Sequence, residues 1–194
     1  MIIQSLILAA SLLAPEAHAT SMVELTPDQL VDASDLIVRA HVDELWTERH
    51  EDGRVWTRVQ LDVTQVLKGD EATEDVVIDL LGGAWAGRAL LVHGSARFDV
   101  GEDVLVYLEE LESGRITVVG KHQGKLTVKM DPQLREPIAF STPLRAQRAY
   151  DHRFYPLPAE DLRVTVDALV DDIAARVEAG WDGQPIPGSN LGVK

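Results

Sequence analysis

The sequence predicts a small, mainly β domain, in which an antiparallel barrel is preceded by a short helix and covered by an amphipathic helix near the C-terminus. Three observations support this fold class. Residues 55–64 have a period of two, with Val59, Leu61 and Val63 on one face and mainly polar side chains on the other, as in a half-buried strand. The connections between the extended segments are too short for parallel crossovers. Residues 162–177 repeat apolar side chains at three- and four-residue steps, as a surface helix does.

The elements follow in chain order, beginning with a short helix within Leu25–Ser34. Thr26 can serve as its N-cap, Pro27 suits the first helical position, and Gln29 completes a capping box. The dipeptide Asp-Gly at residues 52–53 is typical of a hairpin turn between two strands. Strands are predicted over residues 35–46, 55–64, 75–83, 102–111, 115–121 and 124–130, with a further short strand near 88–94.

The first residues predict an export signal. An apolar run over residues 2–14 is followed by Ala-His-Ala at 17–19, whose small first and third residues suit signal peptidase. We therefore expect residues 1–19 to be removed, because the run is shorter than the ~20 residues that span a bilayer. The mature chain is predicted to be periplasmic or extracellular, with no membrane anchor.

The mature chain is predicted to contain one compact barrel and a C-terminal extension. Residues 131–158 show no sustained period, whereas a helical pattern runs from Ala159 to Gly180, a residue suited to end a helix. The predicted parts are the barrel over residues 20–130, a connector and the helix packed on the barrel over 131–180, and a flexible tail over 181–194.

Composition excludes several chemistries. The 194 residues include no cysteine, so disulfides, zinc–thiolate sites and cysteine nucleophiles are ruled out. The formal net charge is −14 at pH 7, and the 18 basic residues are scattered along the chain, which disfavours nucleic acid as a partner. No histidine pair has metal-ligand spacing and no cofactor motif occurs, so we expect neither a metal nor a cofactor.

Acidic residues form a corner where the chain enters the strand predicted at 102–111. Asp99, Glu102 and Asp103 carry oxygen ligands of the kind that calcium accepts. They lack the spacing of a calcium loop, and Gly101 allows the chain to turn sharply between them. We interpret these residues as a solvated turn that leads into the strand.

Short apolar strands and turn residues follow one another in a regular order in the segments ASDLIVRAHV, VQLDVTQVLKGD, VVIDLLGG and ARFDVGEDVLVYLEE. In this order of strands and turns, residues 33–130 resemble the netrin-like domains, the family that includes the tissue inhibitors of metalloproteinases. The resemblance implies a barrel of the oligonucleotide/oligosaccharide-binding (OB) type, in agreement with the periodicity. It also implies a secreted protease or another extracytoplasmic protein as the partner.

The zinc-chelating chemistry of those inhibitors is not expected here. In that family an N-terminal cysteine chelates the zinc of the target and disulfides hold the terminus. The predicted mature terminus is Thr20, and the chain has no cysteine. Inhibition or binding of another kind stays open.

The predicted binding residues are Trp56, Trp85, Arg88 and His93. Three of them belong to the loop of residues 82–98, and loops on a barrel commonly carry binding. Trp56 lies on the polar face of its strand, where an exposed aromatic ring can stack on a sugar or grip a peptide. The alternative is that the C-terminal helix or the connector covers it. No catalytic residue is predicted.

The leading hypothesis is an exported, non-enzymatic binding module that contacts a protein or peptide through barrel loops, because no catalytic constellation occurs in the sequence. A second hypothesis is a hydrolase that uses Ser95 or the pair His93 and Asp99, although Ser95 lies outside the G-x-S-x-G pattern of a nucleophile elbow. A third is a structural envelope protein without a ligand.

Overall fold

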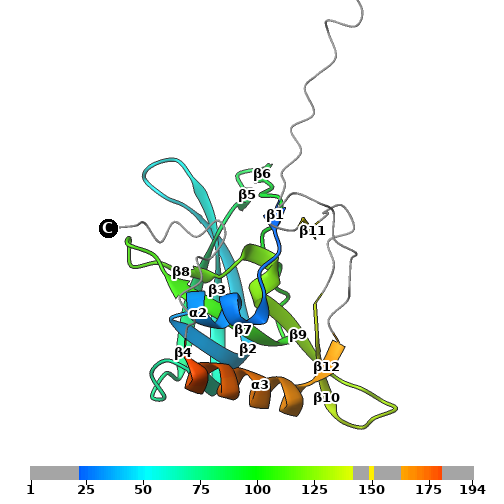
Figure 1. Cartoon of the computed structure of the whole chain (residues 1–194). Coiled ribbons are helices and arrows are strands. Elements are labelled where there is room, and N and C mark those ends of the chain that lie inside the picture. Colours follow the sequence, from blue (N-terminus) through cyan, green and yellow to red (C-terminus); the bar gives the residue numbers. More distant parts are fainter. Residues whose placement is uncertain (1–21, 142–148, 151–162, 181–194) are drawn as a thin grey trace, which may run out of the picture.

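The computed structural model describes residues 22–141, 149–150 and 163–180 of the chain. It confirms the predicted fold class: the chain is mainly β, with a closed five-stranded barrel, a short helix near the N-terminus and a longer helix near the C-terminus (Figure 1). The predicted signal peptide (residues 1–19) and tail (181–194) lie outside the described residues.

The barrel has the strand arrangement of an OB-like fold. Neighbouring strands run antiparallel, except that the third and fifth barrel strands, β4 and β8, are parallel, and β7 closes the ring by pairing with both β2 and β8. The order around the ring is therefore first, second, third, fifth, fourth. The barrel strands are β2 (Leu36–Arg49), β3 (Val55–Lys68), β4 (Asp75–Leu81), β7 (Asp103–Glu110) and β8 (Ile116–Val118).

The sheet continues beyond the barrel through one strand that the sequence predicted, over residues 124–130, and two strands that it did not predict. Strand β7 also pairs with β9, β9 with β10, and β10 with β12, all antiparallel. These outer strands have six, four and three residues, and the two shortest are too short to display a period. The helix predicted from Ala159 begins only at Val166, because the preceding residues are extended and pair with β10. The outer strands are β9 (Lys125–Met130), β10 (Pro137–Phe140) and β12 (Arg163–Thr165).

Smaller elements complete the described chain. The predicted capping box is confirmed: the Gln29 N–H donates to Thr26 Oγ1 at 3.2 Å, and the Thr26 N–H donates to Gln29 Oε1 at 2.9 Å. The remaining elements are β1 (Met22–Val23), α2 (Pro27–Ala33), β5 (Gly83–Trp85), β6 (Arg88–Leu90), the 3₁₀ helix η2 (Lys121–Gly124), β11 (Ala149–Tyr150) and α3 (Val166–Ala179).

Strand β7 is buried on both faces, which divides the interior into two cores. Its Val104, Val106 and Leu108 point into the barrel, where they meet apolar side chains of β2, β3 and β4. Leu105 and Tyr107 point outward into a second core that contains residues of both helices. The sequence of β7 therefore alternates between two apolar sets, because each face has its own cover.

Helix α3 packs on the outer face of the sheet, on the same side as α2 (Figure 1). Its Leu169 and Ile173 are buried in the second core, which confirms the predicted packing of an amphipathic helix on the barrel. The Arg176 guanidinium binds Asp172 on its own helix and Asp28 on α2, so an ion-pair bridge joins the two helices. Among the described helices, none combines the length and apolar character needed to cross a membrane.

The burial of α3 side chains in the second core predicts how much stability is lost when one of them is shortened. Replacing Ile173, which is 1% exposed, with Ala should lower the free energy of unfolding by about 2–5 kcal/mol, because the change leaves a cavity under the helix. The matched change Val177→Ala, at a position 37% exposed on the same helix, should lower it by less than about 1 kcal/mol. Urea denaturation followed by tryptophan fluorescence measures both values, and equal losses would contradict the observed packing.

Candidate functional site

The β5–β6 hairpin follows directly from β4 and lies against one end of the barrel. The Thr57 hydroxyl donates a hydrogen bond to the Gly82 carbonyl at 2.8 Å, and the Gly82 N–H donates to the Val55 carbonyl at 2.8 Å. At Gly83, with φ 132°, a Cβ atom would lie only 2.5 Å from Thr57 Oγ1, so glycine is required for this approach. The backbone at these two glycines fixes the hairpin to the barrel.

Beyond the glycines, the hairpin presents large side chains to solvent. Trp85 is 43% exposed, Leu90 46% and Leu91 75%, and Arg88 and His93 are exposed as well. We refer to these five residues as the hairpin surface. It contains three of the four binding residues predicted from the sequence: Trp85 and Arg88 are paired across the hairpin, and His93 follows β6 in the chain.

The fourth predicted binding residue, Trp56, has a different environment. Its side chain is only 8% exposed. The guanidinium carbon of Arg115 lies 4.4 Å from the centroid of the indole ring, and that of Arg54 lies 5.8 Å away. The prediction that Trp56 is an exposed binding residue is therefore wrong, and the alternative of a covered ring holds, with two arginines over it among the described residues.

A carboxylate on the neighbouring strand accounts for this arrangement. Asp79 of β4 is directly opposite Arg58 of β3 and is buried. Its Oδ1 lies 3.0 Å from Arg58 Nε, and its Oδ2 lies 3.9 Å from Arg115 Nε. Because Asp79 attracts Arg115, the guanidinium is held over Trp56, where the cation–π contact is favourable. The Trp56 Nε1–H is buried and has no acceptor among the described residues.

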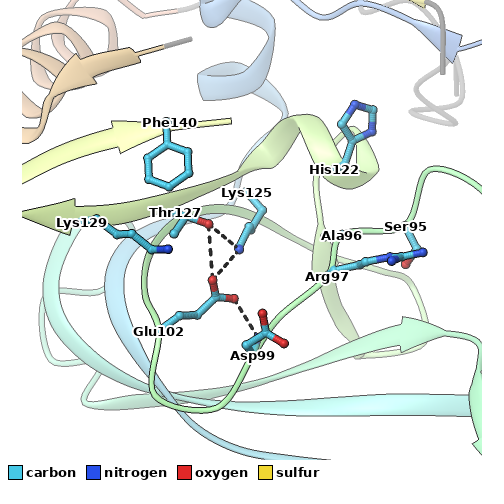
Figure 2. Close-up of a pocket in the computed structure, with 10 residues that line it drawn as sticks. All are labelled: Ser95, Ala96, Arg97, Asp99, Glu102, His122, Lys125, Thr127, Lys129 and Phe140. Atoms are coloured by element: carbon cyan, nitrogen blue, oxygen red, sulfur yellow. Dashed lines mark hydrogen bonds and ion pairs between the residues drawn. The ribbon is translucent and has the colours of Figure 1, made fainter. Parts of the chain in front are cut away.

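A pocket of about 240 Å³ lies beside the segment that leads from the hairpin to β7 (Figure 2). We refer to it as the Lys125 pocket. Its lining comes from that segment, from η2, and from strands β9 and β10. The lining residues are Ser95, Ala96, Arg97, Asp99, Glu102, His122, Lys125, Thr127, Lys129 and Phe140.

A buried ion pair lies at the centre of the pocket (Figure 2). Lys125 is only 8% exposed, and its Nζ donates to Glu102 Oε2 at 2.9 Å and to Thr127 Oγ1 at 2.8 Å. The Thr127 hydroxyl lies 3.3 Å from the same carboxylate oxygen. The second oxygen, Glu102 Oε1, accepts the Asp99 N–H at 2.9 Å. Both carboxylate oxygens and the ammonium therefore have protein partners.

Strand register explains why a lysine is buried here. Lys125 and Thr127 pair with residues of β7 whose side chains fill the barrel, so their own side chains lie on the face that continues the barrel interior. The predicted acidic corner does lead into β7, which begins at Asp103. The prediction that Glu102 is solvated is wrong, because its carboxylate is turned inward to compensate the buried ammonium.

A histidine of the pocket, His122, is half-buried, and one of its ring nitrogens is buried without a hydrogen-bond partner among the described residues. The backbone N–H of His122 donates to the Gly94 carbonyl at 3.0 Å, but its Nδ1 is buried and has no partner among the described residues. Burial lowers the pKa of His122 below its ordinary value of 6.5. The preceding residue, Lys121, has a φ of 62°, a conformation that costs a non-glycine residue about 1–2 kcal/mol.

The hydrolase hypothesis named Ser95, His93 and Asp99, and the structure places only two of these three residues in one pocket. Ser95 and Asp99 line the Lys125 pocket with His122, whereas His93 is exposed on the hairpin surface. In the part of the chain that the structure describes, no hydrogen bond joins Ser95 to a histidine. The pocket therefore contains a serine and a histidine without the contact that activates a nucleophile.

Sequence reasoning missed the residues that give the pocket its charge: Lys125, Lys129 and the inward-turned Glu102. One signal was available. Strand residues 125, 127 and 129 are Lys, Thr and Lys, so the strand has a polar face although it lies among apolar strands. That Glu102 is the carboxylate that pairs with Lys125 could not be predicted without the strand register.

Comparison with known proteins does not identify the chain. A scan against models of known protein families gave no match, and a search of curated proteins gave none either. The netrin-like resemblance of residues 33–130 therefore stays a prediction, and function has to be argued from the geometry of the two sites.

Removing one member of the buried ion pair should destabilise the protein more than removing both. Lys125→Met leaves the Glu102 carboxylate buried without its counter-ion, so the free energy of unfolding should fall by about 3–5 kcal/mol. In the double variant Lys125→Met/Glu102→Leu, apolar groups replace both charges, and most of that loss should be recovered. A double-mutant cycle by urea denaturation measures the coupling, and additive losses would contradict it.

The burial of His122 predicts a dependence of stability on pH. Its pKa is lowered in the folded protein, so the unfolded chain takes up a proton at this position first as the pH falls below about 6.5. The free energy of unfolding should decline as the pH falls from about 7.5 through that value, and this contribution should level off below the folded-state pKa.

The variant His122→Gln isolates this contribution. The stability difference between the wild type and this variant should be smaller at about pH 5.5 than at about pH 7.5, because only the wild type loses stability through this group. The exposed His93 provides the control, since His93→Gln should keep the pH dependence of the wild type. Unfolding curves at the two pH values test both, and an unchanged difference for His122→Gln would contradict the assignment.

Proposed function

We propose that the chain is an exported, non-enzymatic binding module that recognises an extracytoplasmic protein through the hairpin surface. The observation that carries this proposal is the exposure of Trp85, Leu90 and Leu91 on one short hairpin and the residue that follows it. Clustered apolar side chains in solvent mark surfaces that bind other proteins. Tryptophan and arginine, both present here, are the residues most often found to dominate binding energy.

Local charge indicates the chemistry of the partner. The whole chain contains 32 acidic against 18 basic residues, yet residues 80–94 contain no Asp or Glu and include Arg88 and His93. The hairpin and the segment after it thus form an apolar and basic region on an acidic protein. A partner surface with apolar side chains and carboxylates is complementary to it, and the acidic remainder of the chain would steer such a partner toward this region.

The way in which the hairpin is attached also supports binding. The backbone contacts at Gly82 and Gly83 fix its base to the barrel, so the exposed side chains are held in one place relative to the fold. Ordering costs on association are smaller when the contact surface is already in place. The netrin-like resemblance agrees with a protein partner, and a secreted protease is the first class of partner to test.

Loss of the exposed apolar side chains should abolish recognition. We expect the double variant Trp85→Ser/Leu91→Ser to bind the partner at least tenfold more weakly, because interface anchors contribute more than about 1 kcal/mol each. The experiment captures extracytoplasmic proteins of the native host on the immobilised wild-type protein. It then measures the affinity of the purified partner for each variant.

The control is an equally exposed apolar residue elsewhere. Leu134, between β9 and β10, is 57% exposed, and Leu134→Ser should leave the affinity unchanged. Equal affinities for all three proteins would contradict the hairpin surface as the binding site. If the purified chain instead turned over a substrate, and Ser95→Ala abolished that activity, the hydrolase hypothesis would replace this proposal.

A further inference from the structure

We propose that the Lys125 pocket is a binding site for a carboxylate attached to a small apolar or aromatic group. This site is separate from the hairpin surface, and it does not depend on the proposed recognition of a protein by that surface.

The charges that line the pocket do not cancel. Lys125 is paired with Glu102, which leaves Arg97 and Lys129 against the single carboxylate of Asp99. This is a local excess of positive charge in a chain whose net charge is −14. Figure 2 shows the Lys129 ammonium directed toward the Lys125–Glu102 pair, whereas the Arg97 side chain extends toward Ser95 and away from that pair. An anion beside the pair would therefore lie close to the Lys129 ammonium, and the exposed Arg97 would add positive charge at the Ser95 side of the pocket.

The buried ammonium has a donor left for a ligand. A lysine ammonium carries three N–H groups, and Lys125 uses two of them on Glu102 and Thr127. On its other side, Nζ lies 5.3 Å from the centroid of the Phe98 ring. Because charge-assisted hydrogen bonds are roughly twice as strong as neutral ones, a ligand carboxylate is the acceptor that this group favours most.

The size and lining of the pocket indicate which group the carboxylate of the ligand is attached to. The pocket has a volume of about 240 Å³, and a cavity of about 150 Å³ is enough to hold benzene. Phe140 and Ala96 provide apolar surface in the lining. The Lys129 ammonium lies 5.8 Å from the centroid of the Phe140 ring, so one wall of the pocket combines an aromatic face with a cation. A ring that carries a carboxylate is complementary to both.

The cost of building the pocket indicates that it is not there for stability. A buried ion pair is often no more stabilising than apolar residues of similar size. His122 adds a buried nitrogen without a partner, and Lys121 next to it adopts a left-handed backbone conformation. Costly features of this kind concentrate at functional sites, and here they meet at one pocket.

Two sources can supply the same chemistry. One is a free small carboxylate, and the other is the carboxyl terminus of a peptide that ends in an aromatic residue. Two probes distinguish them: benzoate, with benzamide as its uncharged counterpart, and the tripeptide Ala-Ala-Phe, with its C-terminal amide as the uncharged counterpart. All four are titrated into the ¹⁵N-labelled protein at constant ionic strength.

We expect a charged probe to shift the backbone amide signals of residues 95–102 and 125–129, while its uncharged counterpart does not. Shifts with benzoate alone support a free carboxylate, and shifts with the tripeptide alone support a carboxyl terminus. Shifts with both support the shared chemistry. If neither charged probe shifts these signals at millimolar concentration, or if the uncharged counterparts shift them equally, the proposal is overturned.

Matched charge variants test the residues. Arg97→Gln/Lys129→Gln removes two cations that have no ion-pair partner among the described residues but keeps the Lys125–Glu102 pair, and it should weaken binding of the probe about tenfold or more. The control Arg49→Gln/Arg135→Gln removes two exposed cations outside both the pocket and the hairpin surface and should leave the affinity unchanged. Equal affinities of the two double variants would overturn the proposal.

The same experiment separates this site from the proposed function. Trp85→Ser/Leu91→Ser should bind the probe as the wild type does, whether or not it still binds a protein partner. Loss of the signal shifts in that variant would overturn the independence of the two sites.

Discussion

Strand β7 is the element on which the rest of the structure depends. Along its first half it pairs with β2 on one edge and β9 on the other, and its last residues pair with β8 to close the barrel. Residues 104–108 are buried one after another, because the barrel interior covers one face and the helices cover the other. A single strand thus joins the two cores, and neither core is complete without it.

The divergence of β8 and β9 from β7 also accounts for the Lys125 pocket. Where β8 closes the barrel, apolar side chains seal the interior. Strand β9 continues the inner face outside the ring, and there the segment before β7 lies over it and leaves a pocket. Gly101, with φ 86°, forms the turn that starts β7 and carries Glu102 at its end. Fold and pocket therefore share one turn, so a change there would affect both.

Local patterns predicted the barrel well, and contacts between distant segments explain what they missed. The alternation around Val59 and Leu61 and the capping box at Thr26 are visible in the sequence because each involves neighbours within a few residues. Strands β10 and β12 are too short for a period, and extended pairing with β10 delays the start of α3 to Val166. The hairpin residues Trp85, Arg88 and His93 could be predicted because they lie in one glycine-rich segment. The pairing of Glu102 with Lys125 could not, because it depends on the register between β7 and β9.

The two glycines at the base of the β5–β6 hairpin have a consequence for how this protein can change. All residues from 84 to 91 are exposed, so none of their side chains takes part in either core. The hairpin tip can therefore be exchanged for another sequence while the residues that form the two cores stay unchanged. Such a division allows new specificities to arise by mutation or by grafting, as long as Gly82 and Gly83 stay in place.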